Sequence, residues 1–187
     1  SVGGTDWQGG DAAHPEAWRG SGGGFAWGFE APPHQTATVA AYLNTTEGLP
    51  PAASYNASCR AFPDVSAIAV EGTSQSSPIM AGIFTLLTDH RINAGLKPLG
   101  FLAPRLWQAA QKYPGEIWQD VTVGNSKYTS DGSAPCDNGF PAVKGWDPGR
   151  LSAPHNLHHP NLRSLPYRIH IGWAFHFLIP LHYKSNS

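Results

Sequence analysis

The sequence is poor in cysteine, in net charge and in long apolar runs. Its 187 residues include two cysteines, and 12 basic residues nearly balance 13 acidic ones, giving a formal net charge of −1. Two cysteines cannot form the disulfide framework of a small secreted domain. The balanced charge provides no basic surface for nucleic acid or an anionic membrane. Since no stretch approaches the roughly 18 uninterrupted apolar residues of a membrane-spanning helix, we expect neither nucleic-acid binding nor a membrane span.

Glycine and proline, by contrast, are abundant, with 21 and 17 residues. This enrichment is typical of a loop-rich α/β protein rather than of a helical bundle. Hydrophobic residues make up 41% of a chain of single-domain length, which is enough to bury a core. Because the sequence has neither an initiator methionine nor a signal peptide, we expect it to begin within a longer protein.

The clearest motif is a small-residue turn, residues 71–78, that leads into the apolar run 79–87. The pattern predicts that Ser74 lies at the mouth of a helix whose first turn contains Pro78, where a missing amide hydrogen costs nothing. The free amides and the positive end of the helix dipole would then face negative charge developing at Ser74. This environment suits a nucleophilic serine whose reaction passes through an oxyanion. A serine here can also be a helix N-cap, which on position alone is the more frequent case.

Residues 72–78, Gly-Thr-Ser-Gln-Ser-Ser-Pro, resemble the nucleophile motif of the sedolisins, the serine-carboxyl peptidases with a subtilisin-like fold. Further segments similar to this family occur in the family's order, the last three being near matches to its lysosomal members: 1–5, 21–25, 55–58, 60–65, 90–92, 98–102 and 104–106. The similarity extends from Ser1 to about Pro148. This many motifs in one order is far more specific than any of them alone.

The resemblance implies that residues 1–148 form the C-terminal part of a subtilisin-like α/β peptidase domain, a parallel sheet with flanking helices that is incomplete at the N-terminus. It implies Ser74 as the nucleophile. The family's glutamate base, its orienting aspartate and its oxyanion aspartate would all lie upstream of Ser1. Carboxylates in the base role suit acidic pH, where a histidine would be protonated.

Two further departures from the family pattern concern a gap and the tail. The run 67–70 passes almost directly into Glu71, where sedolisins have a hairpin-sized segment of roughly fifteen to twenty residues, several ordinary strand lengths. Residues 149–187 contain six of the nine histidines and no acidic residue. We interpret them as a non-homologous, poorly ordered tail, because the sedolisins continue at this point to a Gly-Thr-Pro stretch and a final helix. The histidines of the tail lack the partners and the regular spacing of a metal site.

Two segments that flank a Gly-, Asp- and Asn-rich loop resemble the calcium-site segments of the sedolisins. By this resemblance, the side chains of Asp120 and Asp147 bind calcium together with the backbone oxygens of Val121, Val143 and Gly145. Calcium takes six or more oxygen ligands, and carboxylates combined with carbonyls of irregular backbone suit it. Alternatively, the two aspartates cap turns, which is a frequent role of aspartate in loops.

Two other acidic residues near the motif receive non-catalytic interpretations. Glu71 lies three residues before Ser74, but the strand-to-turn geometry directs it away, so we interpret it as solvated or bonded to the turn. Asp64 resembles an aspartate that the family keeps near the floor of the active site, and we assign it a structural role.

Periodicity and helix breakers predict the remaining elements. We expect helices over 35–43, 76–93 and 104–112, strands over 65–70 and 118–123, and loops over 6–24, 46–58 and 124–147. The helix 76–93 is apolar on most of its circumference, as expected of a buried central helix. The cysteines Cys59 and Cys136 are not predicted to pair, because the related peptidases usually have glycine at the position of Cys59.

The tripeptides 44–46 and 56–58 are N-glycosylation sequons, which favour a secretory or lysosomal route. Together with the resemblance, they predict a fragment of a lysosomal or secreted tripeptidyl peptidase or endopeptidase that acts on peptides or proteins. We expect the chain alone to be inactive, because the acidic partners are missing. The alternative is a non-catalytic isoform or fragment that at most binds a partner. An unrelated α/β hydrolase is excluded because no Gly-x-Ser-x-Gly elbow is present.

Overall fold

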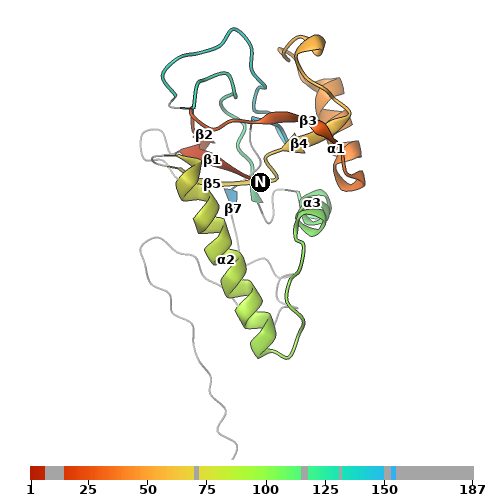
Figure 1. Ribbon diagram of the computed structural model, residues 1–187, viewed down its shortest axis with the longest axis vertical. Coiled ribbons are helices and arrows are strands. Elements are labelled where there is room, and N and C mark those ends of the chain that lie inside the picture. The colour runs from red at the N-terminus through yellow and green to blue at the C-terminus, as the bar shows by residue number, and fades with distance from the viewer. Residues whose placement is uncertain (7–14, 70–71, 115–117, 131, 150–152, 155–187) are drawn as a thin grey trace, which may run out of the picture.

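The computed structural model describes residues 1–6, 15–69, 72–114, 118–130, 132–149 and 153–154. Within these ranges, three α-helices accompany a small mixed sheet and two two-stranded sheets, so the fold is α/β as expected (Figure 1). None of the described helices has the length and hydropathy to cross a membrane. The predicted tail lies outside the described residues apart from Gly149 and the two residues of β7 (Ala153–Pro154).

The central sheet has the strand order β2-β1-β5. β1 (Val2–Asp6) is parallel to β5 (Val65–Ile68) and antiparallel to the short β2 (Glu16–Ala17). β5 is shorter than the predicted strand 65–70, but Ala69 still donates its amide hydrogen to the carbonyl of Thr5 at 2.8 Å. Because the pair is parallel, both strands end at the same edge of the sheet, and α2 begins there (Figure 1).

A second layer is built around β3 (Gly24–Glu30) and β4 (Cys59–Phe62), which pair in antiparallel fashion with an irregularity in β3. These two strands were not predicted from the sequence. The glycines of β3 obscure its alternation, and its outer half is exposed. α1 (Pro33–Thr45) lies close to the predicted helix 35–43.

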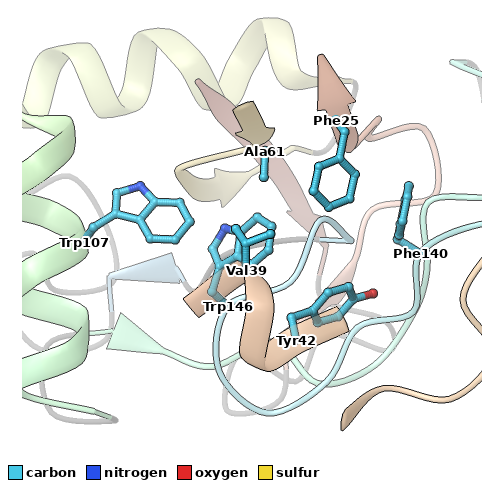
Figure 2. Close-up of a cluster of buried hydrophobic side chains, with 7 residues drawn as sticks. All are labelled: Phe25, Val39, Tyr42, Ala61, Trp107, Phe140 and Trp146. Carbon is cyan, nitrogen blue, oxygen red and sulfur yellow. The ribbon is translucent and has the colours of Figure 1, made fainter. Parts of the chain in front are cut away.

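The larger core cluster lies between α1, β4, α3 (Ala103–Lys112) and the long C-terminal loop (Figure 2). It consists of seven buried side chains: Phe25, Val39, Tyr42, Ala61, Trp107, Phe140 and Trp146. The rings of Trp107 and Trp146 are 5.2 Å apart, and Tyr42 meets Trp146 edge-on at 5.8 Å. Aromatic packing therefore joins α3 and α1 to the loop that holds the predicted metal ligands.

α2 (Thr73–Asn93) packs on β1 and β5 near its first turns and then extends away from the sheet (Figure 1). Only Ser76 and Met80 of this helix are buried, and Ile92 is 53% exposed. The prediction of a buried central helix is therefore wrong for the described part of the chain. The physical reason is the small sheet, which covers only the N-terminal end of one helix face.

The segment after α3 also differs from its prediction. β6 ends after two residues (Trp118–Gln119), instead of continuing to Val123. Its partner is β7, whereas the carbonyl of Val123 accepts a hydrogen bond from Ala17 of β2 at 2.9 Å. The chain thus turns from one sheet to another between these points. The described residues between 124 and 147 form a loop, as predicted. Two isolated bridges hold it, between Asn125 and Pro141 and between Tyr128 and Pro135.

Candidate active site

Ser74 lies in the first turn of α2, at the edge of the central sheet where β1 and β5 both end. β5 ends at Ile68 and α2 begins at Thr73, so a short connection separates the strand from the helix. Helix N-termini and loops converge at the carboxyl ends of parallel strands, which is where α/β proteins place their ligands. The Ser74 side chain is exposed, so its hydroxyl is accessible to a substrate.

Ser76 fastens this end of α2 to the sheet. Its fully buried hydroxyl lies 3.0 Å from the carbonyl oxygens of both Ala67 and Ile68. The hydroxyl has one hydrogen to donate, so the two carbonyls share it. This contact fixes the turn that carries Ser74 against the preceding strand. This role of Ser76 was not predicted, because a run of serine and threonine in a sequence does not show which hydroxyl faces the sheet.

Gly72 is the N-cap residue of α2, so Ser74 is the second residue of the helix. The φ of Gly72 is 134°, a conformation that favours glycine. The alternative interpretation of Ser74 as an N-cap is therefore wrong. Its hydroxyl makes no hydrogen bond to another residue in the described part of the chain, and no structural role of that hydroxyl competes with a chemical one.

The position of Pro78 also differs from the prediction. α2 begins at Thr73 instead of Ser76, and the amide of Gln75 already donates to the carbonyl of Gly72 at 2.9 Å. Pro78 is consequently in the second turn, not in the first. Proline has no amide hydrogen, so the carbonyl of Ser74, four residues earlier, does not receive the usual helical bond. The helix therefore lacks one backbone hydrogen bond at Ser74.

Trp18 borders the space next to Ser74. A Cβ placed on Gly72 would lie 3.6 Å from Cη2 of Trp18 and 3.9 Å from Oγ of Ser74, so both side chains line the same small volume. A Cβ on Gly20 would overlap the indole, and one on Gly4 would lie 3.4 Å from its Cε3. The indole thus occupies a slot formed by glycines from separate segments. Because the slot is tertiary, the sequence offered no signal for Trp18.

No carboxylate is hydrogen-bonded to Ser74 among the residues that the structure describes. Glu71, which we interpreted as solvated or turn-bonded, lies outside them. Asp64 immediately precedes β5, whereas Ser74 follows its far end. A strand of four residues spans about 13 Å, so Asp64 is too distant to act as a base for Ser74.

Asp64 instead joins several elements in the interior. Its Oδ1 accepts hydrogen bonds from Nε1 of Trp107 at 3.0 Å and from Nε2 of Gln35 at 3.3 Å. Its Oδ2 pairs with Arg60 at 2.5 Å and with the N-terminal ammonium group of Ser1. The side chain is 4% exposed. These contacts link α1, β4 and α3 to the start of β5, which agrees with the structural role expected for this residue.

The contacts of Asp64 also determine its charge state. Burial alone would raise its pKa, but the hydrogen bonds from the N-terminal ammonium group and Trp107, together with the charges of that ammonium and Arg60, hold the pKa below its usual value. Asp64 is therefore a carboxylate even at mildly acidic pH.

The five residues predicted to bind calcium come from two segments, which a hydrogen bond between Gly145 and Asp120 joins. The backbone amide of Gly145 donates to Oδ2 of Asp120 at 2.7 Å, and the amide of Val143 donates to Oδ2 of Asp147 at 3.0 Å. Val121 adjoins Asp120 and, like Asp147, is fully buried. Both aspartates thus accept hydrogen bonds from backbone amides, as expected if they cap turns. The residues whose carbonyl oxygens are predicted calcium ligands lie beside them in the sequence.

The oxygen donors that these two segments offer, two carboxylates and three backbone carbonyls, are of the kind that calcium prefers. Asp120 and Gly145 also line a cleft of about 550 Å³, which gives access from solvent. The described residues contain no cluster of three or more His, Cys, Asp or Glu side chains that could hold a metal. A metal here would therefore depend on backbone oxygens for its remaining protein ligands.

The two cysteines do not pair. Cys59 is buried and Cys136 is exposed, and both are free thiols. Sγ of Cys59 contacts the carbonyl of Trp27 at 3.5 Å.

Comparison with known proteins yields close relatives, although no protein-family model matches the chain. Physarolisin of Physarum polycephalum is 40% identical over 147 residues, covering 72% of this chain and 25% of physarolisin. Tripeptidyl-peptidase 1 of Mus musculus is 40% identical and that of Homo sapiens 39% identical, each over 142 residues, covering 68% of this chain and 24% of the relative. The chain thus spans about a quarter of the length of the curated relatives it matches.

The aligned region contains positions of the relatives that this chain lacks. The alignment with physarolisin is 147 residues long, which is longer than the 72% of this chain that it covers. Within the alignment, physarolisin therefore has residues that have no counterpart in this chain. A segment missing before Glu71 is expected to produce such a difference. Physarolisin and tripeptidyl-peptidase 1 are both sedolisins, as the motif around Ser74 predicted. With about 40% identity to these peptidases over more than two thirds of its length, the chain belongs to the sedolisin family.

Proposed function

We propose that this chain is the C-terminal part of a serine-carboxyl peptidase domain that cleaves peptides or proteins at acidic pH, with Ser74 as its nucleophile. The position of Ser74 carries the proposal. The residue is exposed in the first turn of α2, at the carboxyl ends of two parallel strands, and Ser76 fixes that turn to the sheet. The similarity to tripeptidyl-peptidase 1 supports peptidase chemistry.

In the proposed reaction, Oγ of Ser74 attacks the scissile carbonyl and transfers its proton to a base. The free amides and positive dipole end of α2 lie beside the negative charge that develops on the carbonyl oxygen. Trp18 and Gly72 border the same volume, so they would position the substrate and exclude water on that side. The base and the oxyanion carboxylate are assigned by family resemblance to segments upstream of Ser1.

The second candidate is a non-catalytic fragment that at most binds a partner. It is favoured because no carboxylate is hydrogen-bonded to Ser74 in the described ranges, and by the length of the chain, about a quarter of that of its relatives. A serine hydroxyl needs a base within hydrogen-bond reach to become a nucleophile. The two candidate functions therefore predict different results when the missing segments are added. A peptidase part should gain activity, and a binding fragment should not.

Restoring these segments tests the proposal. We define the restored domain as a chimera in which this chain follows the upstream portion of tripeptidyl-peptidase 1 and regains that relative's segment before Glu71. We expect the chain alone to show no turnover of a fluorogenic tripeptide or of denatured protein from acidic to neutral pH. The restored domain should turn over at least one of them at acidic pH, and the preferred substrate separates tripeptidyl release from endoproteolysis.

Two outcomes would contradict this account. Turnover by the chain alone that disappears in Ser74→Ala would show that the chain contains its own base. A restored domain that is folded, as judged by circular dichroism and a cooperative melting transition, but inactive on both substrates would favour the binding fragment.

We also propose that calcium binds the loop of Asp120 and Asp147. When bound, the ion would hold the two strand-flanking segments together and so stabilise the fold. The side chains of the two aspartates and the carbonyls of Val121, Val143 and Gly145 are the proposed protein ligands. Support comes from the hydrogen bonds that join Asp120 to Gly145 and Asp147 to Val143, and from the hard oxygen donors that these residues offer.

Calcium is expected to raise the melting temperature of the restored domain, and Asp147→Asn should remove most of that increase. A ligand that binds only the folded state stabilises it by about 2.7 kcal/mol at a hundred times its dissociation constant. Asparagine keeps an acceptor for the amide of Val143 but removes the charge. Asp137→Asn, an exposed aspartate of the same loop, serves as the control and should keep the full response. A melting temperature unchanged by a chelator would refute the site.

We propose a lysosomal or secreted location for the parent protein. The two sequons support a secretory route, and a carboxylate base is suited to an acidic compartment. In such a compartment the parent would be a glycoprotein.

A further inference from the structure

The outer half of β3 exposes two aromatic side chains. Between the paired positions of β3 and β4, residues 26–29 oppose Arg60 alone. Such a bulge leaves its extra residues unpaired and redirects their side chains. Trp27 is 78% exposed and Phe29 is 73% exposed. A Cβ placed on Gly28, between them, would meet no atom within 4 Å, so the bulge projects clear of the rest of the described chain.

Glu30 follows the two aromatic residues and is also exposed. We call Trp27, Phe29 and Glu30 the β3 knob. It combines two apolar rings with a carboxylate at one end. Exposed aromatic side chains are enriched at protein interfaces, where they act as anchors that fill a pocket of the partner. The surface that fits the β3 knob is therefore concave and apolar, with a cation at its edge.

The cleft beside α3, which we call the α3 cleft, has an apolar wall. Its volume is about 550 Å³, within the range of about 300–1,000 Å³ that accommodates small organic molecules. Two core rings line it, Trp107 and Trp146 (Figure 2). Nε1 of Trp107 donates to Asp64 at 3.0 Å, and Nε1 of Trp146 donates to the carbonyl of Pro63 at 3.1 Å. Because both indole N–H groups are thus occupied, these rings offer apolar surface to the cleft.

The edge of the α3 cleft carries a positive charge. Lys144 is exposed, and it is the cation among the described residues that line the cleft. The two carboxylates of the lining have partners of their own. Asp64 pairs with Arg60, and Oδ2 of Asp120 accepts a hydrogen bond from the amide of Gly145. The charge of Lys144 therefore complements the carboxylate of the β3 knob.

We propose that this chain self-associates through these two unlike surfaces, with the β3 knob of one copy entering the α3 cleft of a second copy. Shape and charge both select a second copy as the occupant, because the rings match the apolar wall and Glu30 matches Lys144. The knob does not occupy the cleft of its own chain, since both of its rings are exposed. The inference goes beyond the proposed peptidase function and holds whether or not the restored domain is active.

The contact is small, which sets its strength. Two aromatic side chains bury roughly 300–500 Å² of their own surface. Together with the cleft wall, the contact stays below the about 1,200 Å² at which stable interfaces begin. We therefore expect weak self-association, absent at roughly 1 µM and present at roughly 200 µM. Trp27 is the expected anchor, because tryptophan is enriched among the residues that dominate binding energy.

Sedimentation velocity of the full chain measures this association, and circular dichroism checks the fold of every variant. The parent should change from monomer to a faster species between the two concentrations. Trp27→Ala and Lys144→Glu should each weaken association by at least about tenfold. Both positions are exposed, so folding should be unaffected. The matched controls Phe101→Ala and Lys97→Glu change exposed residues outside both surfaces and should associate as the parent does.

Mixtures of variants test whether the two surfaces are unlike. Glu30→Lys reverses the charge of the β3 knob and Lys144→Glu reverses that of the cleft edge, so each variant alone should be monomeric. Their equimolar mixture should associate, because each knob then meets a cleft of opposite charge. The second pair is Trp27→Ala and Gln111→Trp, which adds a bulky ring at an exposed position of the cleft lining. Each should be monomeric alone, and their mixture should form a one-to-one complex.

Several outcomes would overturn the inference. A folded parent that stays monomeric at the higher concentration would exclude self-association. Association of Lys144→Glu or Gln111→Trp at the strength of the parent would show that the β3 knob docks outside the α3 cleft. Association of Trp27→Ala at that strength, or failure of both mixtures, would also contradict it. Because no proteolysis is measured, failure here is distinguishable from failure of the proposed peptidase function.

Discussion

Ser74→Ala is expected to reduce peptide hydrolysis by the restored domain by about a million-fold, the usual cost of removing the nucleophile of a catalytic triad. Its folding should be nearly unaffected. The side chain is exposed and is not the helix cap, and its hydroxyl makes no hydrogen bond within the described ranges. Such surface substitutions usually change the free energy of unfolding by less than about 0.5 kcal/mol.

The matched control is Ser77→Ala. Ser77 is an exposed serine of the same helix, only three residues further on. Its substitution should leave turnover close to that of the parent. Initial rates on the tripeptide substrate, measured with melting curves of both variants, separate lost chemistry from lost structure. If Ser74→Ala retained more than a small fraction of activity, Ser74 would not be the nucleophile.

Asp64→Ala should strongly destabilise the isolated chain, lowering its free energy of unfolding by about 3–5 kcal/mol. The substitution leaves Arg60 without its buried partner and removes the acceptor of the Trp107 indole and the Gln35 amide. A single domain is stable by only about 5–15 kcal/mol, so this loss removes a large part of the total. Urea denaturation at neutral pH measures it. Asp89→Ala, at an exposed position on α2, is the control and should cost less than about 0.5 kcal/mol.

The same residue predicts a pH dependence. The pKa of Asp64 is lower in the folded chain than its usual value, because hydrogen bonds and the charges of the N-terminus and Arg60 outweigh burial. Its contribution to stability is therefore fully present above the unfolded pKa, about 3.9, and is lost as the pH falls through the folded pKa. The stability advantage over Asp64→Asn should persist down to about pH 4 and shrink below it. An advantage that did not change between neutral and strongly acidic pH would contradict the assigned charge.

The sequence predicted those elements that depend on local signals. Proline and periodic apolar residues define α1 and α3, which lie within two residues of their predicted bounds. The apolar run of β5 likewise identified a strand. β3 and β4 were missed because glycines and exposed aromatic residues weaken the alternation. Trp27 and Phe29 of β3, for example, are 78% and 73% exposed.

α2 shows where a correct pattern leads to a wrong environment. Its apolar circumference predicted burial on all sides, yet the small described sheet covers only its first turns. Periodicity indicates which residues can be buried, but the partner that buries them is a tertiary property. The same distinction explains why the helix was identified and its burial was not.

At the candidate site, the motif and the family resemblance identified Ser74, and its place at the start of α2 follows from local turn chemistry. The contacts of Ser76 with the end of β5 and the slot that holds Trp18 were not predictable. Both depend on how distant backbone segments approach each other. For three of the predicted calcium residues, by contrast, proximity follows from the sequence alone. Val143, Gly145 and Asp147 are so close in sequence that one loop must bring them together.

The most direct test of the central claim is to trap the acyl-enzyme. The restored domain would be mixed at acidic pH with an activated ester of a short peptide, quenched in acid during the first turnover and digested for mass spectrometry. The account predicts an acyl group on Ser74, present also in Ser77→Ala and absent from Ser74→Ala. An acyl group on any other residue, or turnover with no acylated Ser74, would contradict it.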